Sequence, residues 1–163
     1  MSVMEWTTWP DDWADKKSGR DCVLCTFVRE EDPAWGLRIY TGQVANGYLS
    51  VRGQIPGYCW VIWRDGHVCE PTEVAPADAQ RFFEDLMAVG RAVEGLLAPA
   101  KMNYSVLGNS VPHLHGHVVP RPHRDPAPGG PIPWAHLDDG RQPVAEVERM
   151  AARLRSCFPA REP

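Results

Sequence analysis

Half of the chain's six histidines stand at alternate positions of one short segment, and they are His113, His115 and His117. We expect residues 112–120 to form a strand, and alternate residues of a strand project from the same face of a sheet. The three rings would then lie together, roughly 7 Å apart from one to the next, while Leu114 and Val118 turn toward the core. This alternation predicts a sheet with chemistry on one face and a core on the other.

The other patterns predict an α+β fold, in which helices pack on an antiparallel sheet of about five strands. The expected strands are 38–40, 47–51, 58–63, 103–107 and 112–120. One long helix is expected between Pro76 and Pro99. Its apolar stripe at helical spacing is Phe82, Phe83, Leu86, Val89, Val93, Leu96 and Leu97. The apolar residues of a C-terminal helix are Val144, Val147, Met150, Ala151 and Leu154.

The 163 residues suit one domain, 1–163, with an irregular Trp-rich arm at 1–20 and a Pro- and Gly-rich loop at 123–142. The formal net charge of −4 argues against binding to a nucleic-acid polymer, although small anionic ligands need only local positive potential. The sequence has no run of about 18 apolar residues and no apolar signal core. We therefore expect no membrane partner and a cytoplasmic protein with reduced thiols.

Two chemistries suit three histidines on one face of a strand. Alternating imidazoles can ligate a catalytic metal, completed by another histidine or a carboxylate. Alternatively, one histidine is a nucleophile, and its neighbours orient it and bind phosphate. The Gly-Asn-Ser turn at 108–110 can offer backbone N–H groups and a hydroxyl to phosphate oxygens. This flank favours phosphoryl transfer over a plain metal centre.

The segment 103–121, NYSVLGNSVPHLHGHVVPR, resembles the histidine triad (HIT) superfamily, whose motif is His-x-His-x-His followed by apolar residues. The Gly-x-Ser-Val lead-in at 108–111 and the Pro-Arg pair at 120–121 are also typical of that family. The resemblance covers about residues 20–122 and implies a HIT-like antiparallel sheet, commonly in a homodimer. It also implies a nucleotidyl transferase or a nucleotide hydrolase, such as a dinucleoside polyphosphate hydrolase or a nucleoside phosphoramidase.

Carried over from this resemblance, the middle histidine, His115, would attack the α-phosphorus of a nucleotide derivative and form a nucleotidyl-histidine. A backbone carbonyl would hold its other ring nitrogen. His117 and Ser110 would contact phosphate oxygens and stabilise the charge that develops there. Arg121 would either add positive charge to the site or form an exposed salt bridge. Further substrate-binding positions implied in this way are Asn103, Gly108 and Asn109.

The close pair Cys22 and Cys25 is compatible with a redox pair or with half of a tetrahedral zinc site. By resemblance to zinc-bearing HIT proteins and to galactose-1-phosphate uridylyltransferases, His67 and His113 would complete a closed, structural zinc site. The alternative is a zinc-free protein with two core thiols and an exposed His67. The other cysteines are expected to be packing thiols, and they are Cys59, Cys69 and Cys157. The tail histidines, His123 and His136, are expected to be solvated.

One position departs from the family. Many HIT proteins place an acidic or amide residue where it holds the ribose hydroxyls, and counting back sixteen positions from His67 gives Val51 at that place, next to Arg52. A site lined by valine has no acceptor to leave unpaired, so weak discrimination for the ribose is expected. Two other functions stay open: a non-catalytic nucleotide-binding HIT module, and a metal-dependent hydrolase that uses all three histidines as ligands.

Overall fold

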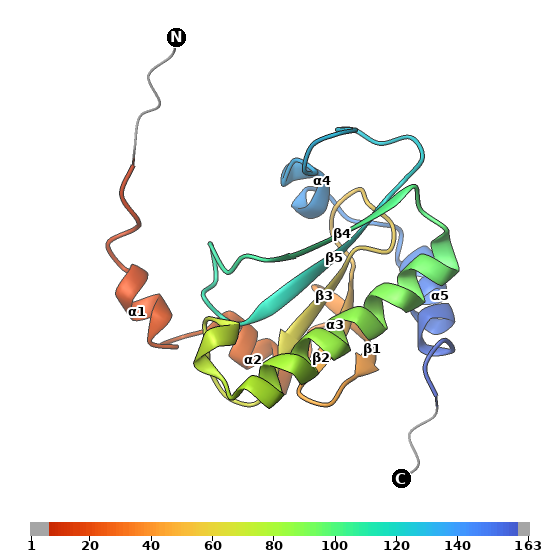
Figure 1. Cartoon of the computed structure of the whole chain (residues 1–163). Helices are drawn as coiled ribbons and strands as arrows, with labels where there is room; N and C mark the ends of the chain where they lie inside the picture. The colour runs from red at the N-terminus through yellow and green to blue at the C-terminus, as the bar shows by residue number, and fades with distance from the viewer. Residues whose placement is uncertain (1–6, 160–163) are drawn as a thin grey trace.

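The computed structural model describes residues 7–159 and confirms the α+β fold. Its centre is one antiparallel sheet of five strands, in the spatial order β1-β2-β3-β5-β4. The strands are β1 (Gly36–Thr41), β2 (Ala45–Ser50), β3 (Cys59–Trp63), β4 (Lys101–Val106) and β5 (His115–Arg121). Figure 1 shows the long helix α3 (Pro76–Leu97) lying across this sheet.

One face of the sheet is buried under α3 and α5 (Val144–Arg155), whose apolar residues form the main core with the strands. Pro76 begins α3, where its missing N–H costs no intrahelical hydrogen bond. The predicted stripe is right for most of its members, but Phe83 is 42% exposed. Successive residues of a helix point about 100° apart, so Phe82 and Phe83 cannot both face the core.

The central strand β5 separates the two faces as its alternation predicts. Leu114, just before the strand, and Val118 are fully buried in the main core. Gly116 lies against Leu86 of α3, and a Cβ there would come within 2.6 Å of that side chain. In the register with β3, His115 lies opposite Ile62 and His117 lies opposite Trp60. Paired residues share a face, so these four side chains project on the side away from α3.

The strand begins at His115, three residues later than the sequence predicts. Pro112 cannot donate to a strand ladder, and the next amides bond elsewhere: His113 N–H to Val111 O, and Leu114 N–H to Val68 O. His113 therefore lies outside the strand. The prediction that all three rings lie together is wrong, because the His113 ring faces the cysteines instead of its two neighbours.

The second face of the sheet is covered only in part. Helix α2 (Val23–Arg29) packs Phe27 against Tyr48 and Ile62, and the short α4 (Ala135–Asp138) packs Leu137 among Tyr58 and its neighbours. The Gln54 N–H donates to His136 O at 2.7 Å, and the Gln142 N–H donates to Val51 O at 3.0 Å. Part of the Pro- and Gly-rich loop is thus docked on the second face.

The N-terminal arm contains one short helix, α1 (Trp13–Lys17), where the sequence predicts irregular chain. Trp9 stacks on Trp13 with ring centroids 4.5 Å apart, and Asp12 pairs with Lys16 one helical turn later. Residues 1–6 of the predicted arm lie outside the described residues. In Figure 1 α1 lies beyond α2, away from the strands. A 3₁₀ turn, η1 (Pro71–Glu73), precedes α3.

Across residues 7–159, none of the helices combines the length and the apolar character that a membrane span requires.

Candidate functional site

The second face of the sheet carries a cavity of about 330 Å³ beside β5. Much of its wall is apolar or aromatic, with Trp35, Trp60 and Trp134 among the lining residues. The polar and charged side chains that line it are Arg52, Asn109, Ser110, His115, His117 and Asp138. A mostly apolar cavity with a few convergent polar groups is the usual form of a small-molecule site.

His115 presents an unprotonated ring nitrogen to this cavity. Its Nδ1 lies 2.5 Å from the carbonyl oxygen of His113, which can only accept, so Nδ1 carries the proton and Nε2 the lone pair. Every buried side-chain nitrogen or oxygen in the described part of the chain has a partner. Nε2 has none, so it is accessible. Burial lowers the pKa of His115 and keeps its ring neutral. The backbone carbonyl expected behind the middle histidine is thus present.

His117 lies beside it, with the two ring centroids 4.9 Å apart. Its Nδ1 is 2.7 Å from the hydroxyl oxygen of Tyr58, and the Trp134 ring stands nearly perpendicular to its ring at a centroid distance of 5.6 Å. Burial, and to a smaller extent the neighbouring His115, lowers the pKa of His117 to about 4. Two neutral imidazoles therefore stand side by side in the cavity wall.

The turn ahead of β5 brings its polar groups to the same cavity. Gly108 has a φ of 67°, a left-handed conformation that glycine adopts without steric cost. Asn109 and Ser110 follow it, are exposed, and line the cavity with His115. Within residues 7–159 their side chains have no hydrogen-bond partner. The turn therefore keeps an amide and a hydroxyl available to a ligand.

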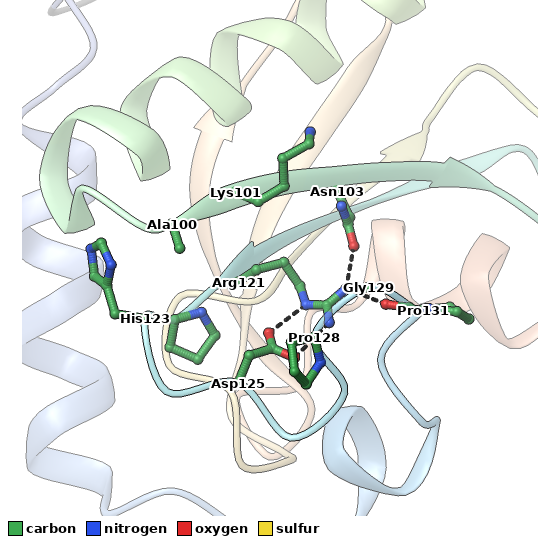
Figure 2. Close-up of a pocket in the computed structure, with 11 residues that line it drawn as sticks. Ala100, Lys101, Asn103, Arg121, His123, Asp125, Pro128, Gly129 and Pro131 are labelled. Carbon is green, nitrogen blue, oxygen red and sulfur yellow. Dashed lines mark hydrogen bonds and ion pairs between the residues drawn. The ribbon is translucent and has the colours of Figure 1, made fainter.

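Arg121 and Asn103 lie outside this cavity. Figure 2 shows Arg121 beside a second cavity, of about 510 Å³, where the loop after β5 folds around its guanidinium group. Its five N–H donors are all used, on both carboxylate oxygens of Asp125, on Asn103 Oδ1, and on the carbonyl oxygens of Ala127 and Gly130.

Arg121 forms the salt bridge that was one of its two expected roles, with Asp125, but the pair is buried where an exposed one was expected. The side chain is buried, not exposed, and it has no donor left for a phosphate. The Asn103 carbonyl oxygen accepts from Arg121 at 2.7 Å, and the expected role of Asn103 in substrate binding stays a prediction. Together these residues fasten the loop that leads to α4.

The first triad histidine, His113, belongs to a second cluster, with Cys22, Cys25 and His67. The four potential ligand atoms lie within 4.8 Å of one another. Three Sγ···Nδ1 distances are 3.4, 3.5 and 3.6 Å, close to the roughly 3.3–3.8 Å between ligand atoms of a tetrahedral zinc site with usual bond lengths. The sequence places these four residues up to 91 positions apart, and the fold brings them together.

The surroundings of the cluster also fit a metal. His113 Nε2 lies 2.8 Å from Trp63 O, and His67 Nε2 lies 3.1 Å from Lys17 O, so each ring turns Nδ1 toward the cysteines. Burial, then the neighbouring Cys22, raises the pKa of Cys25 to about 11, so two thiolates side by side need a cation. Burial lowers the pKa of His113 to about 4, which favours the neutral form that binds metals.

The described residues contain no second group with metal-ligand geometry of this kind. The hydrolase alternative with all three triad histidines on one metal is therefore wrong, because the His113 ring lies in the cluster with the cysteines and not beside His115. Of the three expected packing thiols, Cys59 and Cys69 are buried, and Cys69 Sγ lies 3.6 Å from His67 Nε2, beside the cluster; Cys157 is exposed, so the expectation is wrong for it. His123 is exposed and His136 is half-buried, and both lie outside the two sites.

The expectation that Val51 lies at the place of the sugar hydroxyls is also wrong. Val51 packs against the main core and does not line the cavity. Arg52 and Asp138 line it instead, paired at 3.3 Å, with the Arg52 guanidinium 5.9 Å from the centre of the Trp35 ring. Sequence reasoning missed Asp138 because it lies in the loop-rich tail, where no periodicity or motif marks it. Only the docking of α4 brings it to the cavity.

Known proteins that resemble the chain are also histidine triad proteins. The family model for the HIT domain matches residues 38–124. Solved structures that the chain resembles include a histidine triad protein from Marinobacter aquaeolei VT8, at 24% identity and a TM-score of 0.68 over 77% of this chain and 90% of that one. A HIT protein from Sinorhizobium meliloti 1021 has 25% identity and a TM-score of 0.67, over 76% and 90%.

A zinc-bound histidine triad family protein from Mycobacterium smegmatis is also similar, at 26% identity and a TM-score of 0.62 over 84% of this chain and 92% of that one. None of the curated proteins compared with the chain matches it significantly.

Proposed function

Because the chain belongs to the HIT domain family, we propose that it is a nucleotide hydrolase or nucleotidyl transferase that acts at an α-phosphate through a covalent nucleotidyl-histidine. The observation that carries this proposal is the state of His115. Its ring is neutral, its Nδ1 is held by the His113 carbonyl, and its Nε2 is open to a cavity that an amide, a hydroxyl and a second imidazole also line. An oriented imidazole of this kind is a nucleophile.

In the first step the Nε2 lone pair of His115 attacks the α-phosphorus. An N–P bond forms, and the bond from phosphorus to the leaving group breaks, with its electron pair going to the leaving group. The His113 carbonyl, which already accepts the Nδ1 proton, stabilises the positive charge that the ring gains. In the second step the oxygen of water or another acceptor attacks the phosphorus, and the N–P bond breaks with its electron pair returning to Nε2. The proton of the attacking hydroxyl is released to solvent, and His115 is restored.

The rest of the cavity binds the substrate in this proposal. The Gly108–Ser110 turn, Asn109 and His117 donate to phosphate oxygens, where charge develops in the transition state. The aromatic walls suit a planar base. Asp138 is the carboxylate in the lining and accepts from hydroxyl groups of the sugar.

The proposal includes a structural zinc ion held by Cys22, Cys25, His67 and His113, a set that leaves no open coordination position for chemistry. A zinc site needs reduced thiols, which suits the five free cysteines and a cytoplasmic setting. We also propose a homodimer, because β4 is an edge strand and the nearby side chains Tyr104 and Leu107 are 39% and 48% exposed.

The direct test is a screen of nucleotide conjugates, including nucleoside phosphoramidates and dinucleoside polyphosphates, with the His115→Asn variant in parallel. We expect wild-type turnover of at least one conjugate and a loss of at least about 10⁴-fold in His115→Asn, since no neighbour can replace a positioned nucleophile. His123→Asn, an exposed histidine outside the cavity, is the matched control. Residual activity of a few per cent in His115→Asn would refute the assignment. If wild-type protein bound a nucleotide conjugate tightly but turned none over, the non-catalytic nucleotide-binding module would be the correct function.

A further inference from the structure

A buried aromatic pair stands behind His117. Tyr58 is 2% exposed, and its hydroxyl oxygen lies 2.7 Å from His117 Nδ1. The indole Nε1–H of Trp60 donates to the same oxygen at 2.5 Å. Trp60 pairs with His117 across β3 and β5, so the sheet register holds the indole and the imidazole on one face. The three groups form a short chain of hydrogen bonds that ends at the cavity.

The donors available determine which way each hydrogen bond of this series points. An indole N–H can only donate, so Tyr58 Oη is the acceptor of the first bond. Burial raises the pKa of Tyr58, so the phenol keeps its proton at neutral pH. Within residues 7–159 the hydroxyl has two partners, Trp60 and His117. The phenol proton is therefore directed to His117 Nδ1, which must accept.

From this direction we propose that Trp60 and Tyr58 fix the tautomer of His117, so that its only proton sits on Nε2 and is donated to an oxygen of the bound phosphate or of the leaving group. Nε2 has no protein partner in the described part of the chain and is accessible. This inference rests on the proposed function for the identity of the ligand. Tyr58 touches no reacting atom and is a positioning residue.

The two neighbouring rings thereby receive opposite tautomers. The His113 carbonyl places the proton of His115 on Nδ1 and leaves a lone pair toward the cavity. The Tyr58 hydroxyl places the proton of His117 on Nε2 and leaves a donor toward the cavity. One ring can attack phosphorus while the other donates to oxygen, and each role is set by a single group behind the ring.

The same bond opposes protonation of His117. A proton on Nδ1 would meet the phenol proton, and the phenol cannot turn away without losing its acceptor. The other charged or titratable groups at the ring are His115 on the same strand, and Arg52 and Asp138 in the cavity wall. Removing the phenol takes away one hydrogen bond to the neutral ring and should raise the pKa of His117, while burial and the neighbouring His115 still hold that pKa below its ordinary value.

The test compares Tyr58→Phe with Tyr48→Phe in the full-length protein. Tyr48 is a matched control: it is fully buried in the same sheet, and its hydroxyl bonds to Asn46 and Glu31, not to His117. Imidazole ¹H–¹⁵N NMR spectra, assigned with a His117→Gln variant, report which nitrogen of His117 is protonated. We expect a proton on Nε2 alone in wild type and in Tyr48→Phe, and a mixture of tautomers in Tyr58→Phe.

Kinetics give the second readout. We expect kcat of Tyr58→Phe to fall roughly 10- to 100-fold, less than the loss from deleting a charge-stabilising donor outright, because some molecules keep the Nε2 proton. KM should change little, and the acid limb of the kcat/KM profile should move to higher pH. A wild-type His117 protonated on Nδ1, or a Tyr58→Phe variant with the wild-type tautomer, would overturn the inference. The NMR measurement of the tautomer needs no substrate turnover. A failure of the tautomer inference can therefore be told apart from a failure of the proposed function.

Discussion

His113 and His115 are two residues apart in the chain but serve sites of opposite character. Both ring nitrogens of His113 are committed, Nε2 to the Trp63 carbonyl and Nδ1 to the cysteines. His115 and His117 each have one nitrogen committed and one accessible. The motif alone therefore does not decide which of the two sites a histidine joins. The partner behind each ring decides which of its nitrogens is committed and which is left accessible.

The backbone explains the division. His115 and His117 belong to β5, where alternation places both rings on the open face. His113 lies before the strand, where its amide bonds to Val111 O and its ring turns toward the start of α2. One side of the segment therefore closes around four ligand atoms, and the other opens onto a cavity.

The largest effect is expected from disrupting the cluster that contains His113. We predict about one zinc ion per chain, and chelation or Cys25→Ser should lower Tm by at least about 10 °C, because the binding energy of a structural metal is folding energy. Activity should fall only as the folded fraction falls. Metal analysis and thermal unfolding measure both. Cys157→Ser, which alters an exposed thiol outside the cluster, should match wild type. Protein purified without chelator that contains no zinc would contradict this prediction.

A smaller effect is expected on the open side alone, from Arg121→Met. The substitution strands the Asp125 carboxylate and frees the loop that leads to α4, which carries Trp134 and Asp138 at or beside its ends. We expect KM to rise roughly tenfold, equivalent to about 1.4 kcal/mol, with kcat and zinc content nearly unchanged, and faster proteolysis of the loop. Arg124→Met removes a charge from an exposed position of the same loop and is the control. An unchanged KM would show that the loop does not shape the cavity.

The smallest effect is expected from Asp138→Asn, which tests the sugar contact in the cavity. If Asp138 accepts the sugar hydroxyl, wild type should prefer ribonucleotide over 2′-deoxyribonucleotide substrates by about three- to tenfold in kcat/KM, a modest value because the side chain is 41% exposed and shared with Arg52. The variant should lose this preference, and Asp139→Asn should keep it. Equal preference in wild type and Asp138→Asn would place the sugar contact elsewhere in the cavity.

The sequence predicts the elements and the sheet because hydrophobic periodicity and alternation are local signals. The Cys22, Cys25, His67 and His113 grouping was expected only through the family resemblance, and the structure brings its ligand atoms together. Their spacing alone would not have joined them, since Cys22 and His113 are 91 residues apart.

The errors around the cavity and the loop after β5 come from contacts made by segments without periodicity. The docking of α4 brings Asp138 to the cavity, and the packing of the loop after β5 buries Arg121 and occupies Asn103. Tyr58 begins the predicted strand 58–63, and nothing in its neighbours along the chain indicates a bond to His117. Such pairings depend on loop conformation and on the register between strands, which short-range patterns do not encode.

The most direct test of the account is to map the covalent intermediate on the triad segment. Wild-type protein is quenched during turnover of a nucleotide conjugate, digested, and analysed by fragmentation mass spectrometry that distinguishes the three histidines. We predict an acid-labile, base-stable nucleotidyl adduct on His115, as a phosphorus–nitrogen bond implies, and no adduct on His113, whose ring nitrogens are both committed. An adduct on His113 or His117, or full turnover without any adduct, would contradict it.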